Sequence, residues 1–330
     1  MKRLLAFLVL AGLLASACGG LGLPGAGGPK IGMVTDIGQL EDKSFNEFSW
    51  KGVQDGAKAV GGEAKVIVTK DTADYKQNIQ QFVDQKYDVI VTVGFLIGSD
   101  TLKAAQANPS VQFFGIDQFV ADPAPANYQG LLFNEAQAGY LAGIVAANIT
   151  KSNKIGAVGG VSAVPPVVAF IKGYEAGAKA EKPSIQVLIN YVEDFNAPDK
   201  GEASAKTMIG QGADVIFQVA GLTGAGALRA ACNAKVWGIG VDVDQYLSLP
   251  DAKACIVTSA EKKLQIAATD AIKRWKDTGK QTKNFFNDAK NGGIAASPIR
   301  NLSPVPAGLE DKLKKALEDM KSGKLVPPSK

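Results

Sequence analysis

The sequence of 330 residues contains no histidine and only three cysteines. Histidine is the commonest general base and the commonest metal ligand, so its absence disfavours most hydrolase mechanisms and histidine-ligated metal centres. Three cysteines in a chain of this length exclude a small scaffold held together by disulfides. Neither sign of charge is in large excess, because the sequence has 36 basic and 32 acidic residues, for a net charge of +4. Binding of nucleic acid by phosphate neutralisation needs a larger excess, so we expect a partner near neutral and no nucleic acid.

Long hydrophobic runs are absent beyond the N-terminus. Past residue 17 no window contains eighteen consecutive apolar residues, so no later segment predicts a membrane span. Residues 1–17 have the layout of an export signal, because Lys2 and Arg3 precede an apolar run at 4–15 and then small residues. That run is itself too short to cross a bilayer.

The segment LASAC at 14–18 resembles the processing box of bacterial lipoproteins, in which the cysteine becomes the lipidated first residue of the mature protein. The box usually has leucine three positions before the cysteine, where this chain has Ala15. We expect lipidation of Cys18, with plain secretion as the alternative. Residues 18–29 are rich in glycine and proline and predict a flexible tether of roughly 18 Å. The protein would then be anchored to the cell membrane by lipid, facing the periplasm or the cell exterior.

From Lys30 onward, short apolar strands alternate with helical stretches, which is typical of parallel sheets covered by helices. Four segments recur in the same order along this part of the chain. They are KIGMV at 30–34 and KIGAV at 154–158, KGVQDGAKA at 51–59 and KGYEAGAKA at 172–180, DVI at 88–90 and 214–216, and GID at 115–117 and GVD at 240–242. Their nearly constant spacing predicts an α/β protein with two similar doubly wound, Rossmann-like lobes.

Carboxylates follow three of the predicted strands, at Asp36, Asp117 and Asp242. In open α/β sheets ligands bind beyond the carboxyl ends of the strands, and two facing lobes create a cleft there. Asp117 and Asp242 are equivalent in the repeat, so each wall of the cleft would offer a carboxylate. The alternative for each aspartate is a helix cap or a turn.

The segment DKSFNEFSW at 42–50 begins a predicted helix. Ser44 and Glu47 have the spacing of a capping box, which makes Ser44 the N-cap and Phe45 the first helical residue. Phe45 lies roughly a quarter-turn off the apolar stripe that begins at Trp50. We therefore expect Phe45 to face the cleft, with packing against the preceding loop as the alternative.

Six segments carry a more specific signal: DIGQLEDKSFNEFSWKG, YLAGIVAA, VGGVSAVPPVVAFIKGYEAG, QVAGLTGAG, GVDVDQ and TSAEK. Together they resemble the basic membrane protein family of bacterial lipoproteins, whose best understood members are purine nucleoside receptors of ABC importers. The resemblance runs from about Lys30 to about Lys324. It implies a type I periplasmic-binding-protein fold, in which three crossovers near 131–134, 255–259 and 292–297 join the two lobes.

The same resemblance implies the domain organisation and the partners. Lobe 1 would span 30–133, completed by about 260–292, and lobe 2 would span 134–259, completed by about 297–330. The implied partners are a purine nucleoside and the permease subunits of an importer, with no cofactor and no metal. We expect a monomer.

Nine residues would bind the ligand by analogy with the family. Those facing the base would be Asp36, Ser44, Phe45 and Asn46, with Phe45 stacked on it. Phe195 would close the other face of the base, although Phe170 and Phe217 are competing aromatics. Asp117 would bind from lobe 1, Gly221 would let the backbone approach the ligand, and Asp242 and Lys262 would bind the ribose.

General chemistry favours the same kind of ligand. Aromatic stacking contributes roughly 1–3 kcal/mol per base and tolerates different bases, and carboxylates accept hydrogen bonds from the hydroxyls of a diol. Three aspartates beside one lysine suit a phosphate poorly, so a nucleoside is favoured over a nucleotide. No G-x-x-x-x-G-K-[ST] segment is present, and the glycines from Gly221 to Gly226 lack the dinucleotide-binding spacing.

Several alternatives stay open at this point. Ser259 and Lys262 form an S-x-x-K pair, but the other motifs of penicillin-recognising enzymes are absent. A nucleoside hydrolase would need more carboxylates near the first strand than Asp36 and Asp42. A receptor for a free purine or another small polar ligand, a signalling receptor or an adhesin also remain. Cys232 and Cys255 are compatible with either a disulfide or free buried thiols.

Overall fold

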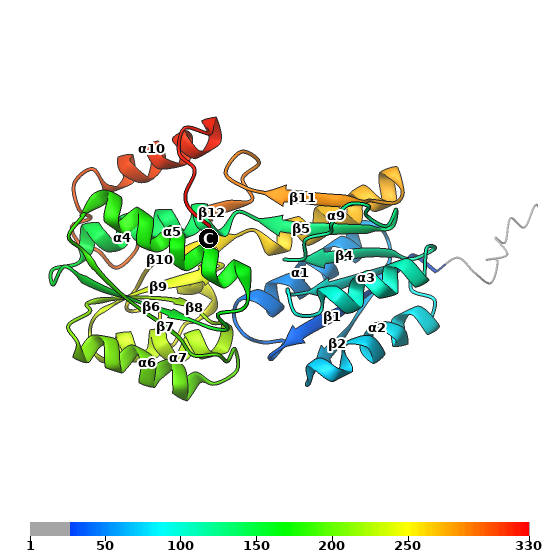
Figure 1. Cartoon of the computed structure of the whole chain (residues 1–330), viewed down its shortest axis with the longest axis horizontal. Coiled ribbons are helices and arrows are strands. Elements are labelled where there is room, and N and C mark those ends of the chain that lie inside the picture. Colours follow the sequence, from blue (N-terminus) through cyan, green and yellow to red (C-terminus); the bar gives the residue numbers. More distant parts are fainter. Residues whose placement is uncertain (1–26, 330) are drawn as a thin grey trace, which may run out of the picture.

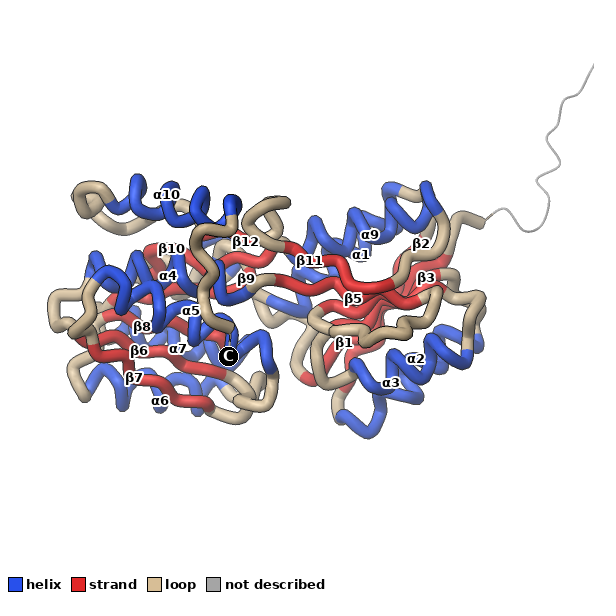
Figure 2. The backbone as a smooth tube through the Cα atoms, turned by 45° about the horizontal axis from the view of Figure 1, so that its top comes forward, coloured by secondary structure: helices blue, strands red, loops and turns tan. Residues whose placement is uncertain are grey.

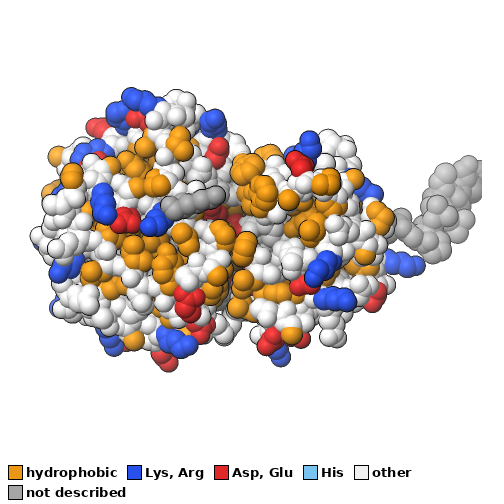
Figure 3. Space-filling view, in the orientation of Figure 1, with side chains coloured by type: hydrophobic (Ala, Val, Ile, Leu, Met, Phe, Trp, Pro, Cys, Tyr) orange, Lys and Arg blue, Asp and Glu red, His pale blue; other side chains and the backbone are white. Residues whose placement is uncertain are grey.

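The computed structural model describes residues 27–329. The predicted signal at 1–17, the predicted lipidation site Cys18 and most of the predicted tether lie outside the described residues. Two lobes lie side by side with a waist between them (Figure 1). Apolar side chains line both sides of this waist on the face that Figure 3 shows. Among residues 27–329, no helix is both long enough and apolar enough to cross a membrane.

Lobe 1 is built on a six-stranded sheet, parallel throughout. Its spatial order is β11 (Lys283–Asn287), β5 (Tyr128–Phe133), β4 (Gln112–Ile116), β3 (Val89–Val93), β1 (Lys30–Ile37) and β2 (Glu63–Thr69). The helical elements of this lobe are α1 (Phe45–Ala59), the 3₁₀ turn η1 (Thr72–Asp74), α2 (Tyr75–Asp84), α3 (Gly98–Ala107) and α9 (Leu264–Thr278). The central strands β3 and β4 are buried along their whole length, as expected for a parallel sheet covered on both faces.

Lobe 2 repeats this plan. Its sheet has the spatial order β12 (Ile294–Ala296), β10 (Ile256–Lys262), β9 (Trp237–Asp242), β8 (Val215–Val219), β6 (Lys154–Gly159) and β7 (Gln186–Tyr191), and only β12 is antiparallel. Its helices are α4 (Glu135–Ile149), α5 (Pro165–Glu181), α6 (Pro198–Gly210), α7 (Gly221–Asn233), α8 (Gln245–Ser248) and α10 (Leu309–Ser322). The predicted duplication is confirmed, because the recurring segments occupy equivalent strands and helices of the two lobes.

Each lobe has one hydrophobic core on each face of its sheet. In lobe 1, α1 and α9 pack together on one face, and α2 and α3 cover the other (Figures 1 and 2). In lobe 2, α4 and α5 cover one face and α6 and α7 the other.

Helices α4 and α5 approach each other closely because glycines face the partner backbone. A Cβ on Gly139 would collide with the carbonyl oxygen of Phe170, and one on Gly173 with that of Ala136. Gly143 and Gly177 make equivalent approaches one turn further along. This packing fixes α4, the first helix after the chain leaves lobe 1, onto the body of lobe 2.

The chain crosses between the lobes three times. The first crossing follows β5 at Asn134. The second lies after Lys262, three residues beyond the predicted boundary at 259, because residues 260–261 pair with β9 and residues 260–262 pair with β12, which extends β10. The third lies between β11 and β12, at 288–293, so β12 already belongs to lobe 2 inside the segment predicted as the crossover.

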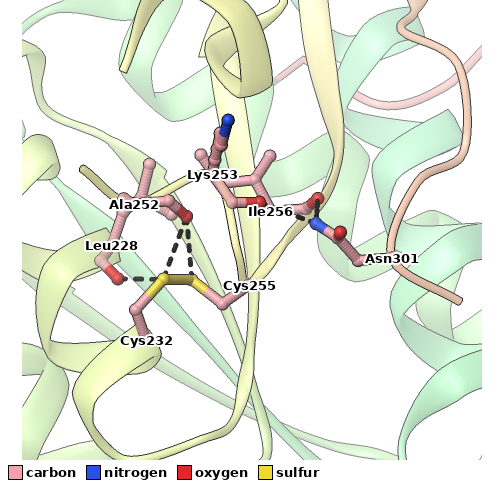
Figure 4. Close-up of a disulfide and its surroundings, with 7 residues drawn as sticks. All are labelled: Leu228, Cys232, Ala252, Lys253, Cys255, Ile256 and Asn301. Carbon is pink, nitrogen blue, oxygen red and sulfur yellow. Dashed lines mark hydrogen bonds between the residues drawn. A yellow bond between two sulfur atoms is a disulfide. The ribbon is translucent and has the colours of Figure 1, made fainter. Parts of the chain in front are cut away.

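Cys232 on α7 and Cys255 before β10 form a disulfide, with their Cα atoms 5.1 Å apart (Figure 4). The sequence left open whether these cysteines are bridged or are free buried thiols, and the structure shows the bridge. The carbonyl oxygens of Ala252 and Leu228 approach the two sulfur atoms at 2.9–3.6 Å. Because disulfide sulfurs carry no hydrogen, we interpret these approaches as oxygen–sulfur contacts. The bridge closes a loop within lobe 2 and lies away from the interlobe cavity.

Candidate ligand-binding site

A cavity between the lobes lies at the carboxyl ends of strands from both sheets. Its volume is about 640 Å³ including its open mouth. Eight of the nine predicted residues line it: Asp36, Phe45, Asn46, Asp117, Phe195, Gly221, Asp242 and Lys262. Ser44 is the exception, since it is fully buried and its hydroxyl donates to Asp242 Oδ2 at 2.8 Å.

The start of α1 differs from the predicted capping box. The helix does begin at Phe45, but the Ser44 side chain makes no cap hydrogen bond. Asp42 does the capping instead, because its carboxylate accepts from the backbone N–H of Ser44 and Asn46 at 2.9 Å and of Glu47 at 3.2 Å. A buried carboxylate satisfies these N–H groups better than a hydroxyl, because it also complements the helix dipole. The Ser44 hydroxyl is thereby left free to reach lobe 2.

Aromatic rings line the cavity from both lobes. Phe45 comes from lobe 1, and Phe195 and Phe170 come from lobe 2. The Phe195 ring fits because residue 160 is glycine, where a Cβ would collide with it. Phe217 is instead a core residue, fully buried with its ring 4.8 Å from that of Tyr174. The structure thus places Phe170 at the cavity beside Phe195 and removes Phe217 from consideration.

Asp117 and Asp242 end equivalent strands with the same unusual backbone. Their φ angles are +61° and +64°, in the left-handed region that non-glycine residues rarely adopt. At Asp242 the turn is closed by a hydrogen bond from Val243 N to Val241 O of 2.7 Å. Strained residues of this kind persist where surrounding structure holds them, and they concentrate at functional sites. The turn directs both carboxylates into the cavity.

Lys262, the last residue of β10, is the cation of the site. Its side chain is 2% exposed, and its Nζ lies 2.5 Å from Asp117 Oδ2, 3.5 Å from Glu135 Oε1 and 4.0 Å from Asp242 Oδ1. Nζ also lies 4.8 Å from the centroid of the Phe45 ring. Burial tends to lower the pKa of Lys262, but the three carboxylates outweigh it and hold that pKa above its usual value. The ammonium group therefore stays charged.

Burial acts in the opposite direction on the carboxyl groups around Lys262, because it raises their pKa values. Burial raises the pKa values of Asp117, Glu135 and Asp242, and the charge of Lys262 only partly offsets this. One ammonium group faces three carboxyl groups, and those that are ionised can accept hydrogen bonds from a ligand with hydroxyl donors.

Asp36, on β1, is a further carboxylate that lines the cavity. Its Oδ1 accepts from the Tyr75 hydroxyl and from its neighbour's backbone, Ile37 N, at 2.7 Å. Burial raises the pKa of Asp36 to about 6, against these hydrogen bonds, and the charge of Asp117 adds to the rise. Tyr75 was not expected from the sequence, because nothing in its pattern separates it from a core tyrosine of α2.

Two buried oxygens in the cavity have no hydrogen-bond partner among the described residues, Asn46 Oδ1 and Asp117 Oδ1. Leaving a buried acceptor unpaired costs about 1–3 kcal/mol. Both atoms belong to residues that line the cavity. The site is therefore suited to a ligand that brings N–H or O–H donors.

Residues 30–325 match the Bmp family, described as ABC transporter substrate-binding protein PnrA-like. The chain belongs to the Bmp family of ABC transporter substrate-binding proteins. The resemblance to the basic membrane protein family is confirmed by this match.

Curated relatives agree with the Bmp assignment. The ABC transporter nucleoside-binding protein BmpA of Lactococcus lactis subsp. cremoris is 34% identical over 322 residues, covering 91% of this chain and 89% of its own. Basic membrane protein A of Borreliella burgdorferi is 33% identical over 268 residues, covering 79% and 76%.

Solved structures confirm the predicted type I fold of this Bmp protein. A solute-binding protein of an ABC transporter from Aeropyrum pernix K1 has a TM-score of 0.80 at 23% identity, covering 92% of this chain and 94% of its own. A second, from Conexibacter woesei, has a TM-score of 0.72 at 26% identity, covering 91% and 99%.

One carboxylate beside the cavity of this Bmp protein, Glu135, was not predicted from the sequence. Glu135 begins α4 directly after the first crossover, and no motif links it to a strand 127 residues later. Its place in the first turn of a helix was the one available signal, since a carboxylate is stabilised there by the helix dipole. Only the packing of α4 against β10 brings Glu135 to Lys262.

Proposed function

We propose that this Bmp protein captures a purine nucleoside in the interlobe cavity and delivers it to the permease of an ABC importer. The observation that carries the proposal is that one cavity is lined both by aromatic rings of the two lobes and by buried charged groups. Phe45, Phe170 and Phe195 line it beside Asp36 and Asn46, and so do Asp117, Asp242 and Lys262. The Lactococcus relative, whose name is that of a nucleoside-binding protein, supports the same ligand class.

The aromatic rings that line the cavity suit a planar base. Phe45 reaches the cavity from lobe 1 and Phe195 from lobe 2, so a base between them is held only when the lobes are closed. Stacking is worth roughly 1–3 kcal/mol per base and does not depend on base identity. The unpaired Asn46 Oδ1 and the carboxylate of Asp36 would accept from N–H groups on the base edge.

The carboxylates that line the cavity suit the hydroxyls of a ribose. Asp242 and Asp117 accept from hydroxyl donors, and hydrogen bonds to charged groups contribute about 1.5–3 kcal/mol each. The cluster is net negative when all three carboxylates are ionised, which disfavours a phosphate. A nucleoside is therefore favoured over a nucleotide.

The protein holds its ligand unchanged in this proposal and is not an enzyme. A nucleoside hydrolase would need free carboxylates beside the first strand, but Asp42 is committed to three backbone N–H groups of α1. Asp36 is likewise engaged by Tyr75. Closure of the lobes around the ligand would shift the population toward the form that the permease recognises. We further propose export, lipidation of Cys18 and an extracytoplasmic, membrane-anchored monomer.

A thermal-shift series with inosine, guanosine, adenosine and the free bases tests the ligand class. A nucleoside at one hundred times its Kd should stabilise the fold by about 2.7 kcal/mol and raise the Tm. Phosphate and ribose serve as negative controls. Chromatography of the same samples should find no released base. Failure of every nucleoside to raise the Tm would overturn the nucleoside proposal, and release of free base would overturn the non-enzymatic one.

A further inference from the structure

A short segment of lobe 1 is bound to lobe 2 through Lys43, Ser44 and Ser248, none of which lines the cavity. The Ser248 hydroxyl on α8 donates to the carbonyl oxygen of Lys43 at 2.7 Å. The Ser44 hydroxyl donates to Asp242 Oδ2 at 2.8 Å and lies 3.2 Å from Val241 O. Lys43 and Ser44 belong to lobe 1, whereas α8 and β9 belong to lobe 2, so these contacts exist only when the lobes are closed.

Lobe 1 presents these groups in a fixed shape. Asp42 accepts from Ser44 N at 2.9 Å, and Glu47 accepts from Lys43 N at 3.2 Å. Lys43 has a φ of +61°, which turns the chain before α1 begins. The Lys43 carbonyl and the Ser44 hydroxyl are thus oriented by contacts within lobe 1, before lobe 2 is met.

Lobe 2 presents its side in an equally fixed shape. Val241 N donates to the buried side chain of Gln245, and Gln245 N donates to Ser259 Oγ, both at 3.0 Å. Ser248 N donates to Asp244 O at 3.2 Å. The turn at Val241 and the short helix α8 are therefore held together within lobe 2.

We propose that Ser248 and Ser44 form a latch that stabilises the closed state without touching the ligand. The latch deepens the proposed receptor function and rests on it. A bond present only in the closed state raises the closed fraction in the absence of ligand. Apparent affinity scales with that fraction, so the latch tightens binding as a positioning device separate from the ligand contacts.

The variant Ser248→Ala tests the latch, because it removes one interlobe hydrogen bond and leaves every cavity-lining residue in place. Spin labels at K103C on α3 and K206C on α6, in the full chain carrying C18S, report the separation of the lobes. Ser248→Thr keeps the hydroxyl. Ser322→Ala is the matched control, since Ser322 donates to Asp319 O at 3.0 Å within one lobe.

We expect the ligand-free wild-type chain to populate a short interlobe distance. Ser248→Ala should lower that population and weaken inosine binding about fivefold, chiefly by faster dissociation. Ser248→Thr and Ser322→Ala should match the wild type. An unchanged distance distribution and Kd in Ser248→Ala, or a ligand-free wild type without the short distance, would overturn the latch. If inosine binds neither form, the ligand proposal fails while the ligand-free distances still decide the latch.

Discussion

Asp117 and Asp242 occupy equivalent positions in the two lobes, share a left-handed backbone and face the same lysine. Asp117 Oδ2 lies 2.5 Å from Lys262 Nζ across the lobe boundary, and Asp242 Oδ1 lies 4.0 Å from it within lobe 2. The repeat therefore places one carboxylate at the end of the equivalent strand in each lobe, and Lys262 of lobe 2 contacts both. The ion pair of Asp117 with Lys262 joins the lobes at the base of the cavity.

Replacement of Asp242 is expected to remove most affinity for a nucleoside. The carboxylate would accept ribose hydroxyls, and loss of hydrogen bonds to a charged acceptor costs about 1.5–3 kcal/mol each. Asp242→Asn should weaken binding about a hundredfold by calorimetry. Asparagine tolerates positive φ and can still accept from Ser44, so the variant should remain folded by circular dichroism. Unchanged affinity in a folded Asp242→Asn would remove this residue from the site.

Lys262→Met should destabilise the protein most strongly at neutral pH. The change leaves three buried carboxyl groups without their cation, and breaking a buried pair from one side typically costs about 3–5 kcal/mol. Without Lys262 the pKa values of Asp117, Glu135 and Asp242 rise further, so stability is lost as pH rises through them. Urea unfolding should show a larger deficit at pH 7.5 than at pH 5. An equal loss of unfolding free energy at both pH values would contradict the expected rise in the pKa values of the three carboxyl groups.

Glu135→Gln provides a coupling test for the same cluster. Alone it removes one of the carboxylates that face Lys262 Nζ, at 3.5 Å. In the Lys262→Met background it should recover part of the lost stability at pH 7.5, because one fewer buried carboxyl group has to take up a proton when the chain folds. A double-mutant cycle by urea unfolding measures this coupling. Strictly additive effects would show that Glu135 and Lys262 do not interact.

Asp36→Asn should stabilise the ligand-free protein at neutral pH. The pKa of Asp36 is raised to about 6 in the folded state from an ordinary value of 3.8, so its contribution to stability is present below about pH 4 and is lost as pH rises through 6. The variant should gain up to about 3 kcal/mol at pH 7.5 and nothing at pH 4. Asparagine still accepts from Tyr75. A flat difference between the two proteins across pH 4–7.5 would contradict the raised pKa.

The disulfide between Cys232 and Cys255 can be tested by titrating free thiols. Unfolded without reductant, the chain should show no reactive thiol from Cys232 or Cys255. Replacing both by alanine opens a loop of 23 residues' separation, which is expected to cost about 3 kcal/mol. Affinity should not change, because the bridge lies on the far side of lobe 2 from the cavity. Two reactive thiols in the unreduced protein would contradict the bridge.

Much of the architecture was predictable because it is repeated. The recurrence of GID as GVD placed Asp117 and Asp242 at the ends of equivalent strands, and strand ends of parallel sheets define one edge. The family motifs then located Phe45, Gly221 and Lys262 at the same cavity. Local pattern and family resemblance pointed to the same positions.

Relations between distant residues were not predictable in the same way. The capping role passed from Ser44 to Asp42 because the Ser44 hydroxyl has a partner in lobe 2, 198 residues away. Tyr75 carries no local signal, and Glu135 carries only its place in the first turn of α4. Phe170 and Phe217 belong to the same core cluster, and only the folded structure distinguishes Phe170, which lines the cavity, from Phe217, which does not. The extension of β10 past residue 259 likewise depends on pairing with two other strands, β9 and the later β12.

The three crossings between the lobes also determine when each lobe can fold. The sheet of lobe 1 gains its edge strand β11 and the cover over α1 only from residues 264–287. A chain interrupted between the two repeats would therefore leave the apolar face of α1 exposed, and a half-gene would not encode an independent lobe. Contacts so far apart in sequence make folding slow. The native state is thus a cooperative property of nearly the whole chain, reached only after both repeats are available.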